Sequence, residues 1–229
     1  MDQIKRPKLL TELVLNYLRE LIVQGDLKLG ETISERQLTE RLKVSKTPIR
    51  EAIKHLMVEG LVEADTQKGA RVFTLSADEV GKICSFRQIL ETAALTLALK
   101  RAKRELILET SEIVNEMHDA QTQRDFRRYL ALDTRFHLTP FKHCDNRFLA
   151  ETYSRHAGKI EALRTHMATK PMHTNLSMTE HQALLGAFAQ DSHREALDML
   201  EAHIDRIRRT YSQEITKAAP ASRVLLQEC

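Results

Sequence analysis

The residues best suited to bind a metal ion are one aspartate and three histidines in the C-terminal part of the chain. Asp133 and His137 are four residues apart on an apolar stripe, so both side chains share one face of the expected helix. His181 and His203 lie on the apolar stripes of two later segments. Neutral imidazole suits zinc, nickel and similar ions, and a carboxylate adds one negative charge. If the three segments converge, the four side chains would hold one divalent ion, with zinc and nickel as the best matches.

The same residues allow two other interpretations. A histidine on an apolar stripe is often a hydrogen-bonded core residue, and the chain has ten histidines. The C-terminal part would then be only a dimerisation scaffold. A bound metal with an open position could also support hydrolysis, but no general base or nucleophile accompanies the set, because Glu180 fits a helix-capping box with Ser177. We therefore expect no enzymatic activity.

Arg87 is the second unusual polar residue on an apolar stripe, which it shares with Ile83 and Leu90. Its guanidinium has two possible partners. It can pair with Glu91 one turn later, or it can clamp the carboxylate of an organic acid through two parallel hydrogen bonds. The sequence leaves both open.

The N-terminal third of the chain carries a cluster of basic residues that could contact DNA. Between Arg36 and Lys54 there are six basic and two acidic residues, a local excess of four, whereas the whole chain has a net charge of only +3. Lys46 and Arg50 lie at the start of an expected helix, where free backbone NH groups favour phosphate. The alternative is an ordinary solvated helix face.

The elements that position this basic cluster form a winged helix-turn-helix. Apolar periodicity predicts a first helix over 9–22, and a capping box at Ser34 starts a short second helix ending near 42. Thr47 followed by Pro48 indicates the N-cap and first position of a third helix, which would enter the major groove. Segments 61–64 and 70–73 are expected to pair as a hairpin, the wing.

The remainder of the chain is expected to be a helical bundle, so the fold class is mainly α. Six helices are predicted, the fifth of them beginning at the Ser177 capping box: 78–100, 103–123, 125–143, 146–167, 177–190 and 192–214. The expected domains are a DNA-binding domain at 1–75, an effector-binding, metal-binding and dimerisation domain at 76–216, and a flexible tail at 217–229.

The composition is that of a globular protein with few turns. Hydrophobic residues make up 42% and charged residues 29% of the chain, and no apolar run reaches the length that spans a membrane. We expect a cytoplasmic protein. The three cysteines are widely separated, which fits reduced thiols rather than a cysteine metal cluster.

The N-terminal domain resembles the GntR family of bacterial regulators, most clearly in the segment Val-Ser-Lys-Thr-Pro-Ile-Arg-Glu-Ala-Ile at 44–53. The resemblance implies a sequence-specific transcriptional regulator, most often a repressor, that binds a near-palindromic DNA operator as a homodimer. Lys46 stands where the family more often has arginine. The residues that the resemblance assigns to DNA contact are Arg36, Ser45, Lys46, Thr47, Arg50 and, in the wing, Gly69.

The C-terminal domain resembles the FCD domain of the FadR subfamily in its shorter, VanR-like form with six helices. The matching segments are 132–137, 180–185 and 202–204. The resemblance implies that a divalent metal is held by Asp133, His137, His181 and His203, and that a small organic acid effector binds beside Arg87. Pro140 departs from the family's continuous helix, and a kink there would displace His137.

Overall fold

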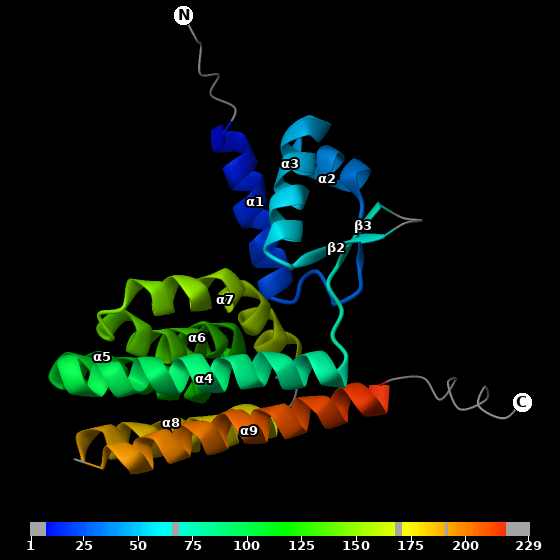
Figure 1. Cartoon of the computed structure of the whole chain (residues 1–229). Coiled ribbons are helices and arrows are strands. Elements are labelled where there is room, and N and C mark those ends of the chain that lie inside the picture. The colour runs from blue at the N-terminus through cyan, green and yellow to red at the C-terminus, as the bar shows by residue number, and fades with distance from the viewer. Residues whose placement is uncertain (1–7, 66–68, 168–170, 191, 219–229) are drawn as a thin grey trace, which may run out of the picture. The chain divides into compact units, whose positions relative to one another are not determined.

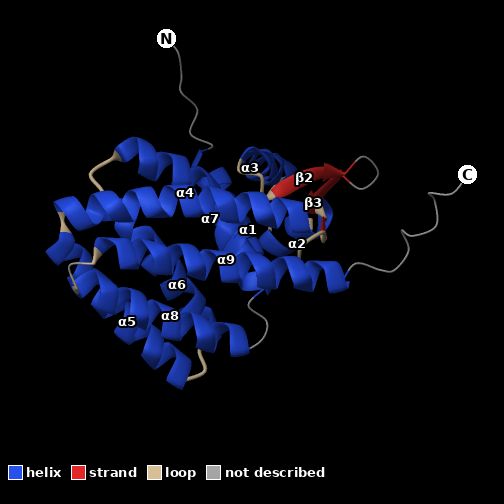
Figure 2. Cartoon of the chain, turned by 60° about the horizontal axis from the view of Figure 1, so that its bottom comes forward, coloured by secondary structure: helices blue, strands red, loops and turns tan. Residues whose placement is uncertain are grey.

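The computed structural model of the 229-residue chain describes residues 8–65, 69–167, 171–190 and 192–218 (Figure 1). Its contacts divide the chain into two compact units, 1–74 with 154–166, and 75–153 with 167–229. Strands among the described residues occur only in the first unit (Figure 2). The expected mainly α fold class is confirmed.

The first unit is a winged helix-turn-helix. Its helices are α1 (Lys8–Val23), α2 (Glu35–Leu42) and α3 (Lys46–Val58), and its strands are β1 (Thr32–Ile33), β2 (Val62–Asp65) and β3 (Gly69–Val72). The strands form an antiparallel sheet in the order β1-β3-β2. The hairpin is the expected wing, and its tip, 66–68, lies outside the described residues. Strand β1 was not anticipated, because two residues are too few for a period-2 pattern.

Helix α1 packs against one face of α3. The apolar stripe of α1 buries Val14, Leu18 and Ile22, whereas α3 buries Ile49 and Leu56. Burial of one such side chain stabilises the fold by about 1.5–3 kcal/mol. The opposite face of α3 is thereby left free to carry charged residues.

The second unit is a bundle of the helices α4 (Ala77–Arg101), α5 (Lys103–Thr122), α6 (Phe126–His143), the beginning of α7 (Arg147–Met167), α8 (Pro171–Ala189) and α9 (His193–Ala218). Helix α4 packs on α6 and α9, α5 packs on α6 and α8, and α8 packs on α9. The helices that carry the candidate metal ligands, α6, α8 and α9, therefore belong to one packed group.

Short polar motifs fix the beginnings of two bundle helices. Ser76 caps α4, because its hydroxyl accepts from the backbone NH of Glu79 at 3.1 Å while the Glu79 carboxylate accepts from the Ser76 NH at 2.9 Å. Asp125 caps α6 by accepting from the NH of Arg128 at 3.0 Å.

In the second unit, two expected boundaries differ from the structure. Helix α8 begins at Pro171, so Ser177 lies inside the helix and is not its N-cap. The capping-box pattern is local, and a serine with a glutamate three residues later also occurs within a helix. Helix α9 continues to Ala218, and the rest of the expected tail, 219–229, lies outside the described residues.

In the part of the chain that the structure describes, no helix combines the length and the apolar character needed to cross a membrane. Cys84 and Cys144 are both buried, and neither forms a disulfide within the described residues.

Candidate functional site

Helix α3 presents the basic residues expected to contact DNA. It begins at Lys46 with Ser45 as its N-cap, so the expected start at Thr47 and Pro48 is wrong by two residues. Pro48 occupies the third helical position, where the missing NH would have had no partner inside the helix. The residues assigned to DNA contact by resemblance are all exposed: Arg36, Ser45, Lys46, Thr47, Arg50 and Gly69.

Gly69 is the first residue of strand β3 and has a φ of +91°, a backbone conformation that residues with a side chain rarely adopt. A Cβ placed there would meet open space. The requirement for glycine is therefore one of backbone conformation, and the open surface is compatible with close approach of the wing to another molecule.

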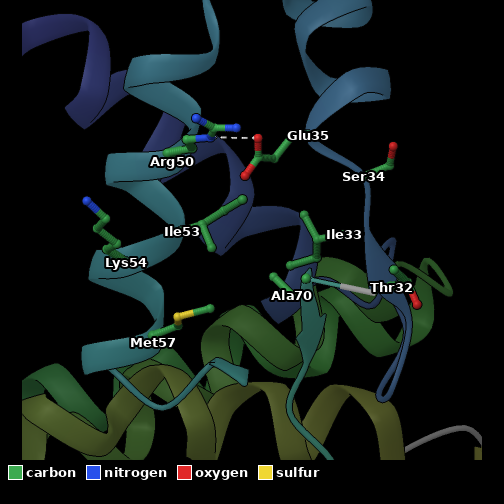
Figure 3. Close-up of a pocket in the computed structure, with 10 residues that line it drawn as sticks. Thr32, Ile33, Ser34, Glu35, Arg50, Ile53, Lys54, Met57 and Ala70 are labelled. Atoms are coloured by element: carbon green, nitrogen blue, oxygen red, sulfur yellow. Dashed lines mark hydrogen bonds and ion pairs between the residues drawn. The ribbon is translucent and has the colours of Figure 1, made fainter. Parts of the chain in front are cut away.

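A groove separates α3 from strands β1 and β3, and an ion pair stands at its rim (Figure 3). The Arg50 guanidinium donates from Nε to Glu35 Oε2 at 2.8 Å. Ile33, Ile53 and Ala70 line the groove beneath that pair. Glu35, at the first position of α2, was not singled out from the sequence.

The structure brings the three predicted histidines together inside the bundle. His137 on α6, His181 on α8 and His203 on α9 are each no more than 2% exposed. Their ring centroids are 4.9–5.4 Å apart, and each offers one nitrogen to a group whose atoms all lie within 4.8 Å of one another. Sequence spacing alone could not establish this convergence.

Asp133 joins the histidine cluster from the turn of α6 that precedes His137. Its Oδ1 lies 3.6 Å from His181 Nε2, and the residue is 6% exposed. The expected kink at Pro140 does not remove His137 from the cluster, because α6 remains helical to His143 with Pro140 inside it.

The orientation of His137 follows from a buried carboxylate. Its Nδ1 lies 2.8 Å from Glu91 Oε2 but 3.4 Å from Arg87 Nη2. The Nδ1 atom either carries a proton and donates to Glu91, or carries a lone pair and accepts from Arg87. The contact with Glu91 is the shorter one and involves a charged acceptor. We therefore assign the proton to Nδ1, which donates to Glu91. The lone pair is then on Nε2.

His203 is oriented in the same way by Glu180. Its Nδ1 lies 2.6 Å from Glu180 Oε2, and Nε2 is buried without a hydrogen-bond partner among the described residues. Arg206 holds the carboxylate by donating from Nε to Oε1 at 2.6 Å. Glu180 was expected to complete a capping box with Ser177. It faces α9 instead, because it lies in the middle of α8.

Burial decides the protonation state of His203. Desolvation lowers its pKa below the ordinary value, although the hydrogen bond and the charge of Glu180 partly offset that effect. The ring is therefore neutral at pH 7, which is the form that coordinates metals.

Arg87 is almost fully buried, at 1% exposure, and pairs with Glu91 through Nε at 2.8 Å. Burial, the largest single influence, lowers the pKa of Arg87. The charge of Glu91, the influence of Tyr153 and the hydrogen bond to Glu91 together outweigh burial and raise the pKa, so the guanidinium stays charged. The Tyr153 hydroxyl also donates to Glu91, at 2.7 Å. The pairing with Glu91 is thus present, and an organic acid at Arg87 stays a prediction. No pattern in the sequence pointed to Tyr153 as a partner of Glu91 or to Arg206 as a partner of Glu180.

The fold and these two sites define a class of protein, a winged helix-turn-helix protein with an all-helical C-terminal domain. The family description "Bacterial regulatory proteins, gntR family" matches residues 10–72, and the FCD domain matches residues 82–206. The chain belongs to the gntR family of bacterial regulatory proteins and carries an FCD domain. It is a DNA-binding transcriptional regulator and not an enzyme.

Similarity to known proteins extends over most of the chain. The uncharacterized HTH-type transcriptional regulator YdhC of Bacillus subtilis (strain 168) is 30% identical over 83% of this chain and 85% of its own length. A probable D-xylose utilization operon transcriptional repressor of Paenarthrobacter nicotinovorans is 30% identical over 79% of this chain and 74% of its own length. The E. coli McbR/YncC structure has the same fold, with 21% identity, a TM-score of 0.76 and coverage of 90% and 98%.

The buried carboxylate yields a prediction about stability. Glu91→Ala would leave the Arg87 guanidinium buried without its partner, and we expect the free energy of unfolding to fall by about 3–5 kcal/mol. Urea denaturation followed by circular dichroism, with a chelator present, measures the change. A double variant, Arg87→Met with Glu91→Leu, should recover only the part of the loss that comes from the unpaired guanidinium, because the donors of His137 and Tyr153 still lack their acceptor. A decrease below about 1 kcal/mol in Glu91→Ala would contradict the importance of this pair.

Proposed function

We propose that the chain is a metal-dependent repressor whose bundle binds a divalent ion and a small organic acid, and whose ligand state changes the affinity of a homodimer for a near-palindromic operator. The observation that carries the proposal is the convergence of three buried histidines from three helices, two of them oriented by carboxylates. The division of labour would follow the expected domains, with 1–75 reading DNA and 76–216 sensing.

The donor set fits a divalent metal. Three imidazoles and one carboxylate are common ligands of zinc and suit nickel. Ligands about 2.0–2.1 Å from a zinc ion are roughly 3.3 Å from one another, so an upper bound of 4.8 Å among the histidine nitrogens requires only small side-chain movements. The buried Nε2 of His203 gains a partner in this way. Asp133, His137, His181 and His203 would hold the ion.

The bound ion would act as a Lewis acid that attracts anionic ligands. The charges of the neighbouring groups support the same preference. Arg87 offsets Glu91 and Arg206 offsets Glu180, so Asp133 and a divalent ion leave one net positive charge in the site. A small carboxylate would neutralise this net positive charge, and Arg87 would contribute a fixed positive charge next to the carboxylate. An organic acid is therefore the class of effector that the site favours.

The action on DNA would follow from a shift between two populations of the dimer. An effector that binds one arrangement of the two DNA-reading heads more tightly than the other favours that arrangement, and the shift cannot exceed the difference in affinity. A homodimer is expected because two DNA-reading heads are needed to contact the two half-sites of a near-palindromic operator. Repression is favoured because relatives are named as repressors. A regulator of this kind acts on the chromosome, hence in the cytoplasm.

Metal content tests the proposal directly. We expect close to one divalent ion per chain after incubation with zinc or nickel and gel filtration, as measured by elemental analysis. The variant Asp133→Ala, His137→Ala, His203→Ala should retain none, because it loses three of four ligands. His143→Ala is the matched control, since His143 lies on α6 but bonds to Glu109, and it should keep the ion. If the wild-type protein binds no metal, the proposed metal site is contradicted, and the bundle is a dimerisation scaffold or contains a metal-free pocket.

Glu180 should affect metal affinity without being a ligand. In Glu180→Gln the charge that supports His203 is lost, and we expect the affinity for zinc to fall by about 10- to 100-fold in competition with a chromophoric chelator. Arg206→Gln removes a partner of Glu180 but keeps its carboxylate, and should bind zinc at least as tightly as wild type. Equal affinity in Glu180→Gln and wild type would contradict this role.

Arg50 is expected to contact operator DNA. Arg50→Ala should lower the affinity for a duplex selected from a random library by about 1–3 kcal/mol, in a shift assay at fixed salt. Arg104→Ala removes the same charge from the exposed surface of α5 and should bind as wild type. Unchanged binding by Arg50→Ala would contradict the assignment of α3 as the reading helix.

A further inference from the structure

The ion pair at the rim of the groove joins two helices of the DNA-reading unit. Glu35 is the first residue of α2, and Arg50 lies 15 residues later on α3. The Arg50 side chain is 57% exposed and that of Glu35 36%. An exposed pair of this kind adds little to stability, so its position on the reading helix suggests another role.

The geometry of the pair leaves one edge of the guanidinium available. Nε of Arg50 donates to Glu35 Oε2, whereas its two terminal amino groups have no hydrogen-bond partner among the described residues (Figure 3). Arginine reads guanine by donating two parallel hydrogen bonds to O6 and N7. Because Nε is already engaged, the terminal pair of amino groups is the edge that can face a base.

We propose that Glu35 is a specificity-determining residue that holds the Arg50 guanidinium in the orientation that reads guanine. Fixing the side chain before DNA binds reduces the conformational entropy that the arginine loses on contact. The carboxylate also repels phosphate, so it disfavours contacts of Arg50 with the DNA backbone of any sequence. Glu35 therefore raises discrimination and lowers non-specific affinity. The inference rests on the proposed DNA contact of Arg50.

A second ion pair on α3 provides a matched control. Lys54 donates from Nζ to Glu51 at 2.8 Å, within the same helix. Glu51 is also partly exposed, at 46% for its side chain, and it pairs with Lys54, whereas Arg50 pairs with Glu35. Glu51→Gln therefore makes the same change of charge on the same unit without releasing Arg50.

The test is a selection of duplexes from a random library by the full-length wild-type protein, followed by binding assays with Glu35→Gln, Glu35→Ala, Arg50→Ala and Glu51→Gln. We expect wild type to enrich guanine at one position of each half-site and Arg50→Ala to lose that preference. One bidentate arginine contact supplies roughly 5- to 150-fold discrimination. In both Glu35 variants the discrimination in favour of guanine should be at least about threefold lower than in wild type. Their affinity for a scrambled duplex at low salt should equal that of wild type or exceed it.

The outcomes separate the two levels of the proposal. Unchanged base preference in Arg50→Ala would overturn the reading role of Arg50 and the inference with it. Loss in Arg50→Ala with full discrimination in both Glu35 variants would overturn the role of Glu35 alone. Equal loss in Glu51→Gln would show a general charge effect and also overturn it. Thermal melting of each variant identifies any loss that comes from unfolding.

Discussion

Burial of three imidazole rings in one helical bundle is the constraint on which the C-terminal unit depends. Burial disfavours the charged form of such a ring, and its buried nitrogens need partners. Glu91 and Glu180 provide such partners for Nδ1 of His137 and His203. Because each of these two carboxylates is itself paired with an arginine, neither glutamate is an isolated negative charge.

The two units use charge in opposite ways. The first exposes cations on α3, where water and salt screen them and DNA can reach them. The second holds its charged groups in fully or partly buried pairs around the histidine cluster, where a ligand would meet a fixed and poorly screened field. A regulator needs both kinds of site, because DNA contact must be reversible while the response to a ligand requires a defined pocket.

Periodicity predicted most of the fold and the candidate metal ligands. Asp133 and His137 could be found because four residues make one turn of a helix, and His181 and His203 because apolar stripes identify buried faces. The capping pattern at Ser177 did not give the start of α8, because the same local pattern also occurs inside a helix. The contact of Tyr153 with Glu91 joins residues 62 apart, and no local pattern encodes it.

X-ray absorption spectroscopy at the zinc edge of the zinc-loaded protein tests the central claim most directly, because it identifies the atoms bound to the ion. We expect a shell of nitrogen and oxygen atoms at about 2.0–2.1 Å, with the outer-shell scattering of three imidazoles. The triple variant at Asp133, His137 and His203 should lack that signature. A spectrum with sulfur ligands, or with no imidazole scattering, would contradict a metal site built from this histidine cluster.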